Sequence, residues 1–267
     1  MRDKGLGALA RNLWMYRGLI WRMAARDIRS RYAGSVVGLF WSVIHPLAMI
    51  AVFTLVFSHL LKMSPFSGED SYIFYLVAGL LPWIGFQEVI QRSSTAFVDN
   101  AALIKKIPFP LEVLVANILL AGTFNLLLSL GIFVIILPLA GDLSQWGLLL
   151  LPLVIFLQVV FELGLVLFLA TLTVFYRDIA QVTGVALFLW FWLTPVVYKV
   201  DFLSPGLRKL FMLNPFYHLA ELYRASFLGS DTPALPAILA LVGVSILFLW
   251  IGSRVFDRLK REVPEVV

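Results

Sequence analysis

Arginines crowd the stretch that precedes the first long apolar segment of the chain. Those best placed to share a phosphate-bearing ligand are Arg22, Arg26, Arg29 and Arg31. A guanidinium group pairs with phosphate through parallel hydrogen bonds. At about 100° per residue most of these arginines share one helix face, with Ile20 and Ala24 on the opposite face. We therefore predict an amphipathic helix over residues 11–33 along the membrane surface; a simple arginine cluster held by anionic lipids is the alternative.

A single carboxylate, Glu162, lies near the middle of a long apolar segment, with Gln158 one helical turn before it. An acid at that depth is costly, and ion-coupled carriers place their coupling carboxylate there. The alternative is a hydrogen-bonded side chain that holds helices together. Because no basic partner is obvious in the apolar segments, the sequence favours the structural role.

Motifs for bond chemistry are missing from the sequence. There is no G-x-x-x-x-G-K-[ST], H-E-x-x-H or G-x-S-x-G pattern, and there is no cysteine. The histidines His45, His59 and His218 lie far apart in the topology we infer below. We therefore expect no catalytic residue, no metal site and no cofactor in this chain.

Composition places these residues in a membrane. Hydrophobic residues make up 61% of the 267 residues and charged residues only 14%, which is too little polar surface for a soluble protein. A helix needs about 20 residues to cross roughly 30 Å of hydrocarbon. Segments of sufficient length lie near 36–61, 72–91, 111–139, 147–174, 181–198 and 235–256. We therefore predict an all-α polytopic membrane protein with six spans.

The basic residues predict the orientation of these spans. Sixteen of the 21 lysines and arginines fall on the side that carries both termini, and the positive-inside rule makes that side cytoplasmic. This gives a cytoplasmic N-terminal region over 1–35, a six-span domain over 36–256 and a cytoplasmic tail over 257–267. Since the basic residues follow the membrane topology, the net charge of +5 does not indicate nucleic-acid binding.

Residues 204–229 are too polar to span a membrane and too regular for a free loop. Pro205 and Pro215 each suit the first turn of a short helix, and Asn214 is a good N-cap for the second. We predict two short re-entrant helices in the outer leaflet. Non-helical backbone at that depth must be sheltered by protein or face water, so this region is expected at the outer mouth of a pathway.

Five stretches of the sequence together resemble one family. They are RDIRSRYAGSVVGLFWS from Arg26, KIPFP from Lys106, FYRDI from Phe175, LTPVVY from Leu193 and LNPFYHL from Leu213. Their order and residue sequence are similar to those of the membrane permease of polysaccharide-exporting ATP-binding-cassette transporters, the type-2 class that includes O-antigen and teichoic-acid exporters. The resemblance covers nearly the whole chain.

The resemblance implies a homodimer in the bacterial inner membrane with two separate ATPase subunits, which would bind ATP and Mg²⁺. The implied substrate is a glycan on undecaprenyl diphosphate that crosses at the dimer interface. In the cytoplasmic loop over 92–110, a coupling helix is expected between Ser94 and Pro108. Its contacts with the ATPase are expected from Asp99, Lys105 and Lys106; an ordinary basic loop is the alternative.

The resemblance also implies roles for particular side chains. The outer gate is expected at Pro205, Asn214, Pro215 and Tyr217. Sugar rings stack on aromatic faces, and the aromatic lining of the path is expected at Trp41, Phe53, Trp190, Phe191, Trp192 and Tyr198; each of these aromatics has packing as its alternative role. The arginines at 22, 26, 29 and 31 are expected to meet the substrate diphosphate, with lipid headgroups and the ATPase as alternative partners.

Three other functions remain open at this point. The first is an exporter of the same architecture for teichoic acid, a drug or another lipid. The second is an ion-coupled secondary carrier that uses Glu162. The third is a membrane-embedded lipid-modifying enzyme, which would need a clustered acid–base or metal set that we do not find in the sequence.

Overall fold

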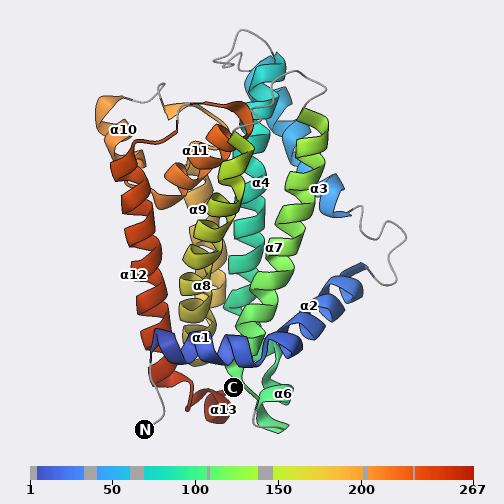
Figure 1. Ribbon diagram of the computed structural model, residues 1–267, viewed down its shortest axis with the longest axis vertical. Helices are drawn as coiled ribbons and strands as arrows, with labels where there is room; N and C mark the ends of the chain where they lie inside the picture. Colours follow the sequence, from blue (N-terminus) through green and yellow to red (C-terminus); the bar gives the residue numbers. More distant parts are fainter. Residues whose placement is uncertain are drawn as a thin grey trace.

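A computed structural model describes residues 5–32, 41–60, 69–106, 109–137, 147–200, 204–230 and 232–267. The side chains of Arg31 and Trp41, two of the predicted site residues, lie outside the described part. Every regular element within these ranges is a helix (Figure 1). The predicted all-α fold is therefore confirmed.

Within the described ranges, four helices are long and apolar enough to cross a membrane. They run roughly side by side along the long axis of the molecule (Figure 1). These helices are α4 (Glu69–Ser94), α7 (Leu111–Ile136), α8 (Leu151–Phe175, preceded by the 3-10 turn Gly147–Leu150) and α12 (Leu235–Leu259). They coincide with the second, third, fourth and sixth predicted spans.

The other two predicted spans correspond to shorter apolar helices. α3 (Trp41–Phe53) continues into the π-helical segment η2 (Thr54–Leu60), and α9 (Ile179–Trp192) has 14 residues. At 1.5 Å per residue α9 is about 21 Å long. The span predicted over 181–198 therefore extends past the end of the helix. Pro195 explains the early end, because proline disfavours helical backbone at the preceding residue and has no N–H to donate.

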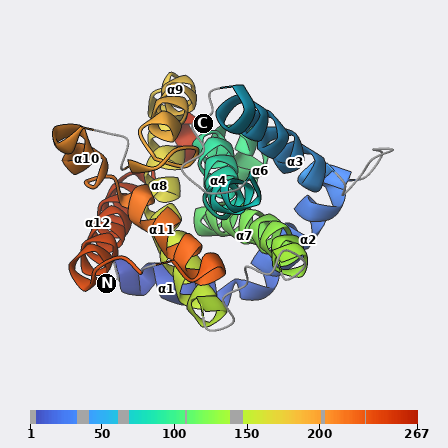
Figure 2. The same ribbon diagram turned by 90° about the horizontal axis from the view of Figure 1, so that it is seen from above.

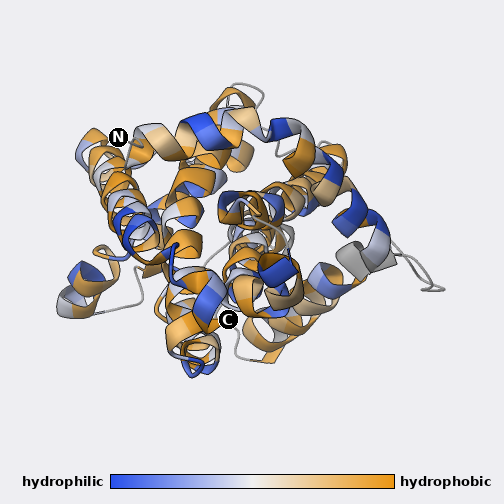
Figure 3. Ribbon diagram, turned by 90° about the horizontal axis from the view of Figure 1, so that it is seen from below, coloured by the Kyte–Doolittle hydropathy of each residue, from blue (hydrophilic) through white to orange (hydrophobic). Residues whose placement is uncertain are grey.

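The described chain begins and ends at the same end of the bundle, which we call the basal face (Figure 1). It carries α1 (Leu6–Met15), α2 (Arg17–Tyr32), α5 (Ala96–Asp99), α6 (Ala101–Lys106) and α13 (Val263–Val266). The opposite end, the distal face, carries α10 (Pro205–Phe211) and α11 (Pro215–Leu228). Seen from below, hydrophilic segments are scattered along α1 and α2, whereas the upright helices are mostly hydrophobic (Figure 3).

The amphipathic helix predicted over 11–33 is wrong in one respect, because the structure forms two helices with a break at Tyr16. Tyr16 has φ −96° and ψ 12°, outside the helical region. Both helices keep a buried face, with Leu9 on α1 and Ile20 and Ala24 on α2. α1 crosses the base of the bundle and α2 rises away from it (Figure 1). The break changes the direction of the helix axis, so that α1 and α2 can each pack their buried residues against the bundle.

The closest packing between long helices joins α8 to α12. A methyl group added at Gly252 would overlap the carbonyl of Gly164, and one added at Gly164 would overlap the backbone of Phe248 and Leu249. Small residues at a helix crossing allow this backbone approach, which is a main source of helix association in membranes. The crossing fixes α12 against the bundle core.

We expect Gly252→Ala to lower the stability of the chain by about 1–3 kcal/mol, because backbone on both sides of the crossing cannot give way. Gly243→Ala is the matched control on the same helix. No atom lies within 4 Å of its added methyl group, so helix propensity alone should stabilise it by about 0.5–1 kcal/mol. Thermal unfolding of the purified variants in detergent measures both effects. Equal midpoints for the two variants would contradict the backbone contact.

Candidate functional site

The chain between α9 and α10 contains a non-helical segment, residues 193–198, which we call the distal turn. Its central residues are buried, with Thr194 and Val196 fully enclosed. The six carbonyl groups from Leu193 to Tyr198 each accept a hydrogen bond. In apolar surroundings an unpaired carbonyl costs several kcal/mol. The distal turn therefore depends on the groups that donate to it.

Arg224 of α11 donates to two of these carbonyls. Its Nη2 lies 2.9 Å from the oxygen of Pro195 and 3.0 Å from that of Val196. Its Nη1 donates to the carboxylate of Glu221, and the guanidinium carbon lies 3.6 Å from the ring centroid of Tyr75. The side chain is only 1% exposed. A carboxylate, an aromatic face and carbonyl dipoles together compensate this buried charge.

Two tyrosines of α4 complete the row of donors. The hydroxyl of Tyr72 donates to the carbonyl of Val197 at 3.0 Å, and the hydroxyl of Tyr75 donates to that of Tyr198 at 3.2 Å. Since α4 crosses the whole bundle, these bonds fix the distal turn to the central helix of the fold (Figure 2).

Asn214 joins the end of α9 to the start of α11. Its Oδ1 accepts from the backbone N–H of Phe216 at 3.0 Å, which confirms the predicted N-cap. The same oxygen accepts from the indole Nε1 of Trp190 at 2.8 Å. Its Nδ2 donates to the carbonyl of Leu193 and to the hydroxyl of Thr194. One amide therefore caps one helix and closes the end of another.

The other predicted gate residues lie around this cluster. Pro205 and Pro215 occupy the first positions of α10 and α11, as the sequence predicts. α10 stands apart from the bundle in both views, and none of its residues is buried (Figures 1 and 2). Tyr217 packs against His218, with ring centroids 5.0 Å apart. Asn214 is thus the predicted gate residue that contacts the distal turn directly.

Arg224, Tyr72 and Tyr75 were not among the predicted site residues. One signal was available for Arg224: an arginine three residues after Glu221, in a stretch too apolar for a free loop, suggests a buried pair. No comparable signal marks the two tyrosines, because their partners are backbone atoms more than 120 residues away.

Four of the predicted path aromatics lie where α3, α4 and α9 meet, and their roles remain predictions: Phe53, Trp190, Phe191 and Trp192. Phe53 and Phe191 have ring centroids 5.6 Å apart, and Trp190 packs edge-on against Phe86 of the core at 5.3 Å. Trp192 is 41% exposed. Trp190 and Phe191 are therefore anchored in packing on one side, while Trp192 presents its ring outward. Tyr198, in the distal turn, donates its hydroxyl to the carbonyl of Trp192 at 2.6 Å, and the Trp41 side chain lies outside the described residues.

Glu162 is enclosed in the core of the bundle. It is 2% exposed and accepts a hydrogen bond from Gln158 Nε2 at 2.8 Å. Gln158 also donates to the carbonyl of Pro82 on α4, and it accepts from the hydroxyl of Tyr223 on α11 at 2.7 Å. The network ties three helices together, which supports the structural interpretation of Glu162.

The predicted coupling residues lie on the basal face. Asp99, Lys105 and Lys106 are exposed on the short helices α5 and α6. Phe97 of the same segment is fully buried, with its ring 6.2 Å from that of Phe256 on α12. The segment therefore presents a charged surface while it is anchored to a long helix.

The arginines predicted to meet phosphate lie on one exposed side of α2. Arg22, Arg26 and Arg29 are exposed, and within the described part of the chain no hydrogen bond or ion pair engages their side chains. Asp27 on the inner side of the helix forms an ion pair with Arg92 of α4 at 2.8 Å. This pair fixes α2 to the bundle and leaves the three arginines facing outward.

A polar network fastens α1 to the basal ends of α7 and α12. Glu112 of α7 accepts from Asn12 at 3.1 Å and pairs with Lys260 at 3.4 Å. Lys260 also pairs with Asp257, whose second oxygen accepts from the backbone N–H of Gly5 at 2.6 Å. The acidic groups of the described ranges do not gather in threes as a metal site requires.

We expect Arg224→Gln to destabilise the chain by about 3–5 kcal/mol, because it leaves Glu221 and two carbonyls without their donor. The stability of Arg224→Lys should lie between that of Arg224→Gln and that of the native chain, since the single ammonium nitrogen cannot reach all three acceptors. Lys209→Gln, an exposed change on α10, should stay within about 0.5 kcal/mol. Thermal unfolding in detergent measures all three. If Arg224→Gln had the same unfolding midpoint as Lys209→Gln, the distal turn would not depend on Arg224.

Comparison with known proteins agrees with this architecture. The family model of the ABC-2 type transporter matches residues 18–228. The O-antigen export system permease protein RfbA of Myxococcus xanthus is 30% identical over 97% of this chain and 99% of its own length. An RfbA of Klebsiella pneumoniae is 28% identical over 91% of this chain and 92% of its own length. The polysialic acid transport protein KpsM of Escherichia coli is 20% identical over 86% of this chain and 89% of its own length.

The family match covers well over half of the chain and includes α2, both short apolar helices, the distal turn and α11. The chain belongs to the ABC-2 type transporter family, as a membrane permease homologous to O-antigen and polysialic acid export permeases.

Proposed function

We propose that this chain is the membrane subunit of an ATP-driven exporter that moves a lipid-linked polysaccharide across the bacterial inner membrane. The observation that carries the proposal is the near full-length similarity to O-antigen export permeases. The substrate is a glycan on undecaprenyl diphosphate, and the path runs between two copies of the chain. ATP and Mg²⁺ bind to two separate ATPase subunits.

In this proposal all six apolar helices belong to the membrane and the basal face is cytoplasmic. The excess of basic residues in the segments at the basal face supports that orientation. α9 alone is too short to cross. The distal turn, with its carbonyls all paired, supports a continuation of the polypeptide at membrane depth beyond α9.

The ATPase acts on the basal face in this mechanism. When it binds ATP, it pushes on the exposed charges of α5 and α6, at Asp99, Lys105 and Lys106. The buried contact of Phe97 with Phe256 supports transmission of this push to α12. The polar network of Glu112 and Lys260 supports transmission to α1. The bundle then moves as a unit against its second copy.

The path lies along α3 and α9, whose outward faces are apolar and exposed. Exposed side chains on these faces include Leu47, Val52, Leu55, Val182, Val185, Phe188 and Trp192. Since Phe53 contacts Phe191, the two faces adjoin. A second copy that covers both faces would shelter them from lipid on one side and enclose a path. Aromatic rings along it, including Trp192, allow sugar rings to stack without fixed hydrogen bonds.

The diphosphate of the substrate enters at the basal face. The exposed arginines of α2 at positions 22, 26 and 29 supply guanidinium groups that match phosphate oxygens. Arg31, whose side chain lies outside the described part of the chain, belongs to the same proposed contact. α2 precedes α3 in the chain, which supports an approach of the lipid headgroup to the path from this side. Asn214, Pro205, Pro215 and Tyr217 belong to the outer gate on the distal face.

Reversal of charge on α6 should uncouple export. We expect Lys105→Glu/Lys106→Glu to reduce surface glycan at least 10-fold in cells that lack their own permease and carry this chain with its ATPase. Lys105→Arg/Lys106→Arg keeps the charge and should retain most export. Surface glycan is measured by gel analysis of the outer membrane, with chain abundance measured in parallel. Full export by the charge-reversed variant, at equal abundance, would show that these lysines do not take part in coupling to the ATPase.

Replacement of Glu162 separates the exporter from an ion-coupled carrier. Glu162→Gln keeps a hydrogen-bonding side chain beside Gln158, so at least half of the export should remain. A change of the Walker A lysine in the ATPase subunit should abolish export in the same cells. If Glu162→Gln abolished export and the ATPase change did not, the chain would be a carrier.

A further inference from the structure

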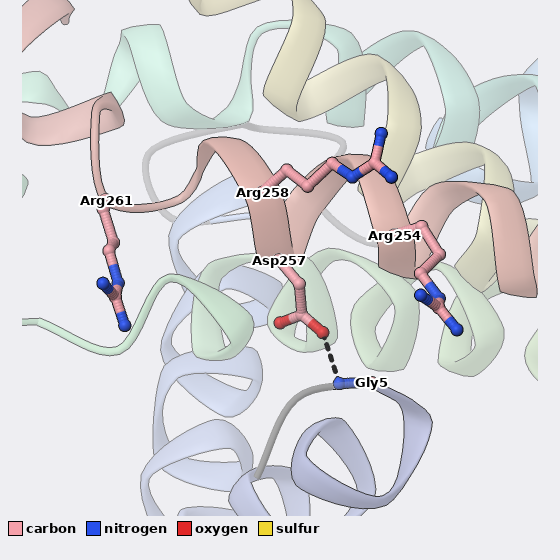
Figure 4. A pocket seen from close by; sticks show the side chains of 5 residues that line it. All are labelled: Gly5, Arg254, Asp257, Arg258 and Arg261. Carbon is pink, nitrogen blue, oxygen red and sulfur yellow. Dashed lines mark hydrogen bonds between the residues drawn. The ribbon is translucent and has the colours of Figure 1, made fainter. Parts of the chain in front are cut away.

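A cavity of about 410 Å³ lies at the basal end of α12. Its walls are Gly5, Arg254, Asp257, Arg258 and Arg261 (Figure 4). Arg258 follows Arg254 by four residues, and Asp257 and Arg261 are likewise four apart, so the four charged residues share one face of the helical segment. The proposed function uses none of these three arginines.

The acid in the cavity already has hydrogen-bond partners, whereas the described residues offer none to the arginines. One oxygen of Asp257 accepts from the backbone N–H of Gly5 and the other from Lys260, each at 2.6 Å. In Figure 4 the Asp257 side chain points to Gly5, and the arginine side chains lie around it. Within the described part of the chain no hydrogen bond or ion pair engages Arg254, Arg258 or Arg261. The cavity therefore presents three uncompensated guanidinium groups.

The position of the cavity relates it to lipid. α12 is the most outward-facing of the four long helices, with 17% of its most apolar stretch buried against 44–72% for the others. Beyond its first turn, its large exposed apolar side chains are Leu239, Ile246, Leu247 and Trp250. At about 100° per residue they share a sector of roughly 120° with Arg254, Arg258 and Arg261. The arginines thus continue the lipid-facing stripe.

Trp250 marks the level at which this stripe leaves the hydrocarbon. Tryptophan concentrates at membrane–water interfaces, and the guanidinium carbon of Arg254, one turn further, lies 5.3 Å from the indole centroid. Basic groups just beyond that level meet the phosphates of the leaflet. A surface for the ATPase would point along the bundle axis, whereas this stripe points sideways into lipid.

We propose that this cavity binds the phosphate headgroup of an anionic phospholipid from the leaflet at the basal face. The arginines supply bidentate donors to the phosphate, and the backbone at Gly5 brings the start of α1 into the same cavity. A bound lipid would therefore fasten α1 to α12. This inference concerns lipid binding and does not depend on which molecule the protein exports.

The test measures lipid retention by the purified full chain, stripped of lipid in a neutral detergent and titrated with phosphatidylglycerol or phosphatidylcholine under native mass spectrometry. The native chain should bind phosphatidylglycerol more tightly than the zwitterionic lipid. Arg254→Gln/Arg258→Gln should weaken phosphatidylglycerol binding at least 10-fold. Lys105→Gln/Lys106→Gln removes the same charge from the same face and should change it less than twofold.

Arg254→Lys/Arg258→Lys keeps the charge and should recover part of the lost affinity. Helical content by circular dichroism shows that each variant is folded, and the exposed positions of these arginines make unfolding unexpected. Equal binding by the native chain and the Arg254→Gln/Arg258→Gln variant would overturn the proposal, as would equal losses in both glutamine pairs. Displacement of phosphatidylglycerol by undecaprenyl diphosphate at a tenfold lower concentration would also overturn it, since the cavity would then be a substrate site.

Discussion

The structure depends on one constraint, that non-helical backbone inside an apolar bundle must find a donor for every carbonyl. The distal turn meets this constraint at six consecutive residues, and Arg224 is central to how it does so. Gly79 of α4 leaves the space, because a methyl group there would lie 2.8 Å from Arg224 Nη2. Once these donors are in place, α9 can end early and α11 can pack at the distal face. A distal face built in this way is held by specific hydrogen bonds and not by apolar packing alone.

The basal face is built from the opposite kind of interaction. There α2 is fastened by the partly exposed ion pair of Arg92 with Asp27, and α1 by polar contacts such as the hydrogen bond from Asn12 to Glu112. Polar contacts near water are weaker and respond to charges nearby. Between the two ends, Gly164 and Gly252 hold α8 and α12 in backbone contact. A force applied by an ATPase at the basal face would therefore act first on the weakly held helices α1 and α2. It would then pass along the closely packed pair α8 and α12 to the hydrogen-bonded distal turn. This order suits a device that transmits movement from one membrane face to the other.

Local signals in the sequence predicted much of this. The apolar runs predicted the long helices, and Asn214 followed by a proline predicted a helix start, because both effects act within a few residues. The break at Tyr16 carries no proline and follows from how two buried faces meet the bundle. The roles of Tyr72 and Arg224 rest on contacts with distant backbone, which no local pattern contains. The sequence left the role of Glu162 open between ion coupling and helix packing. Its buried hydrogen bond with Gln158, which in turn bonds Tyr223, supports the packing role.

The most direct test of the account is ATP-driven transfer in vesicles that contain this chain, its ATPase and a glycan linked to undecaprenyl diphosphate. An impermeant glycosidase would report glycan that has reached the compartment facing the distal side. The account predicts protection without ATP and cleavage after ATP addition, only when both proteins are present. Transfer that required an ion gradient in place of ATP, or that proceeded without the ATPase, would contradict it.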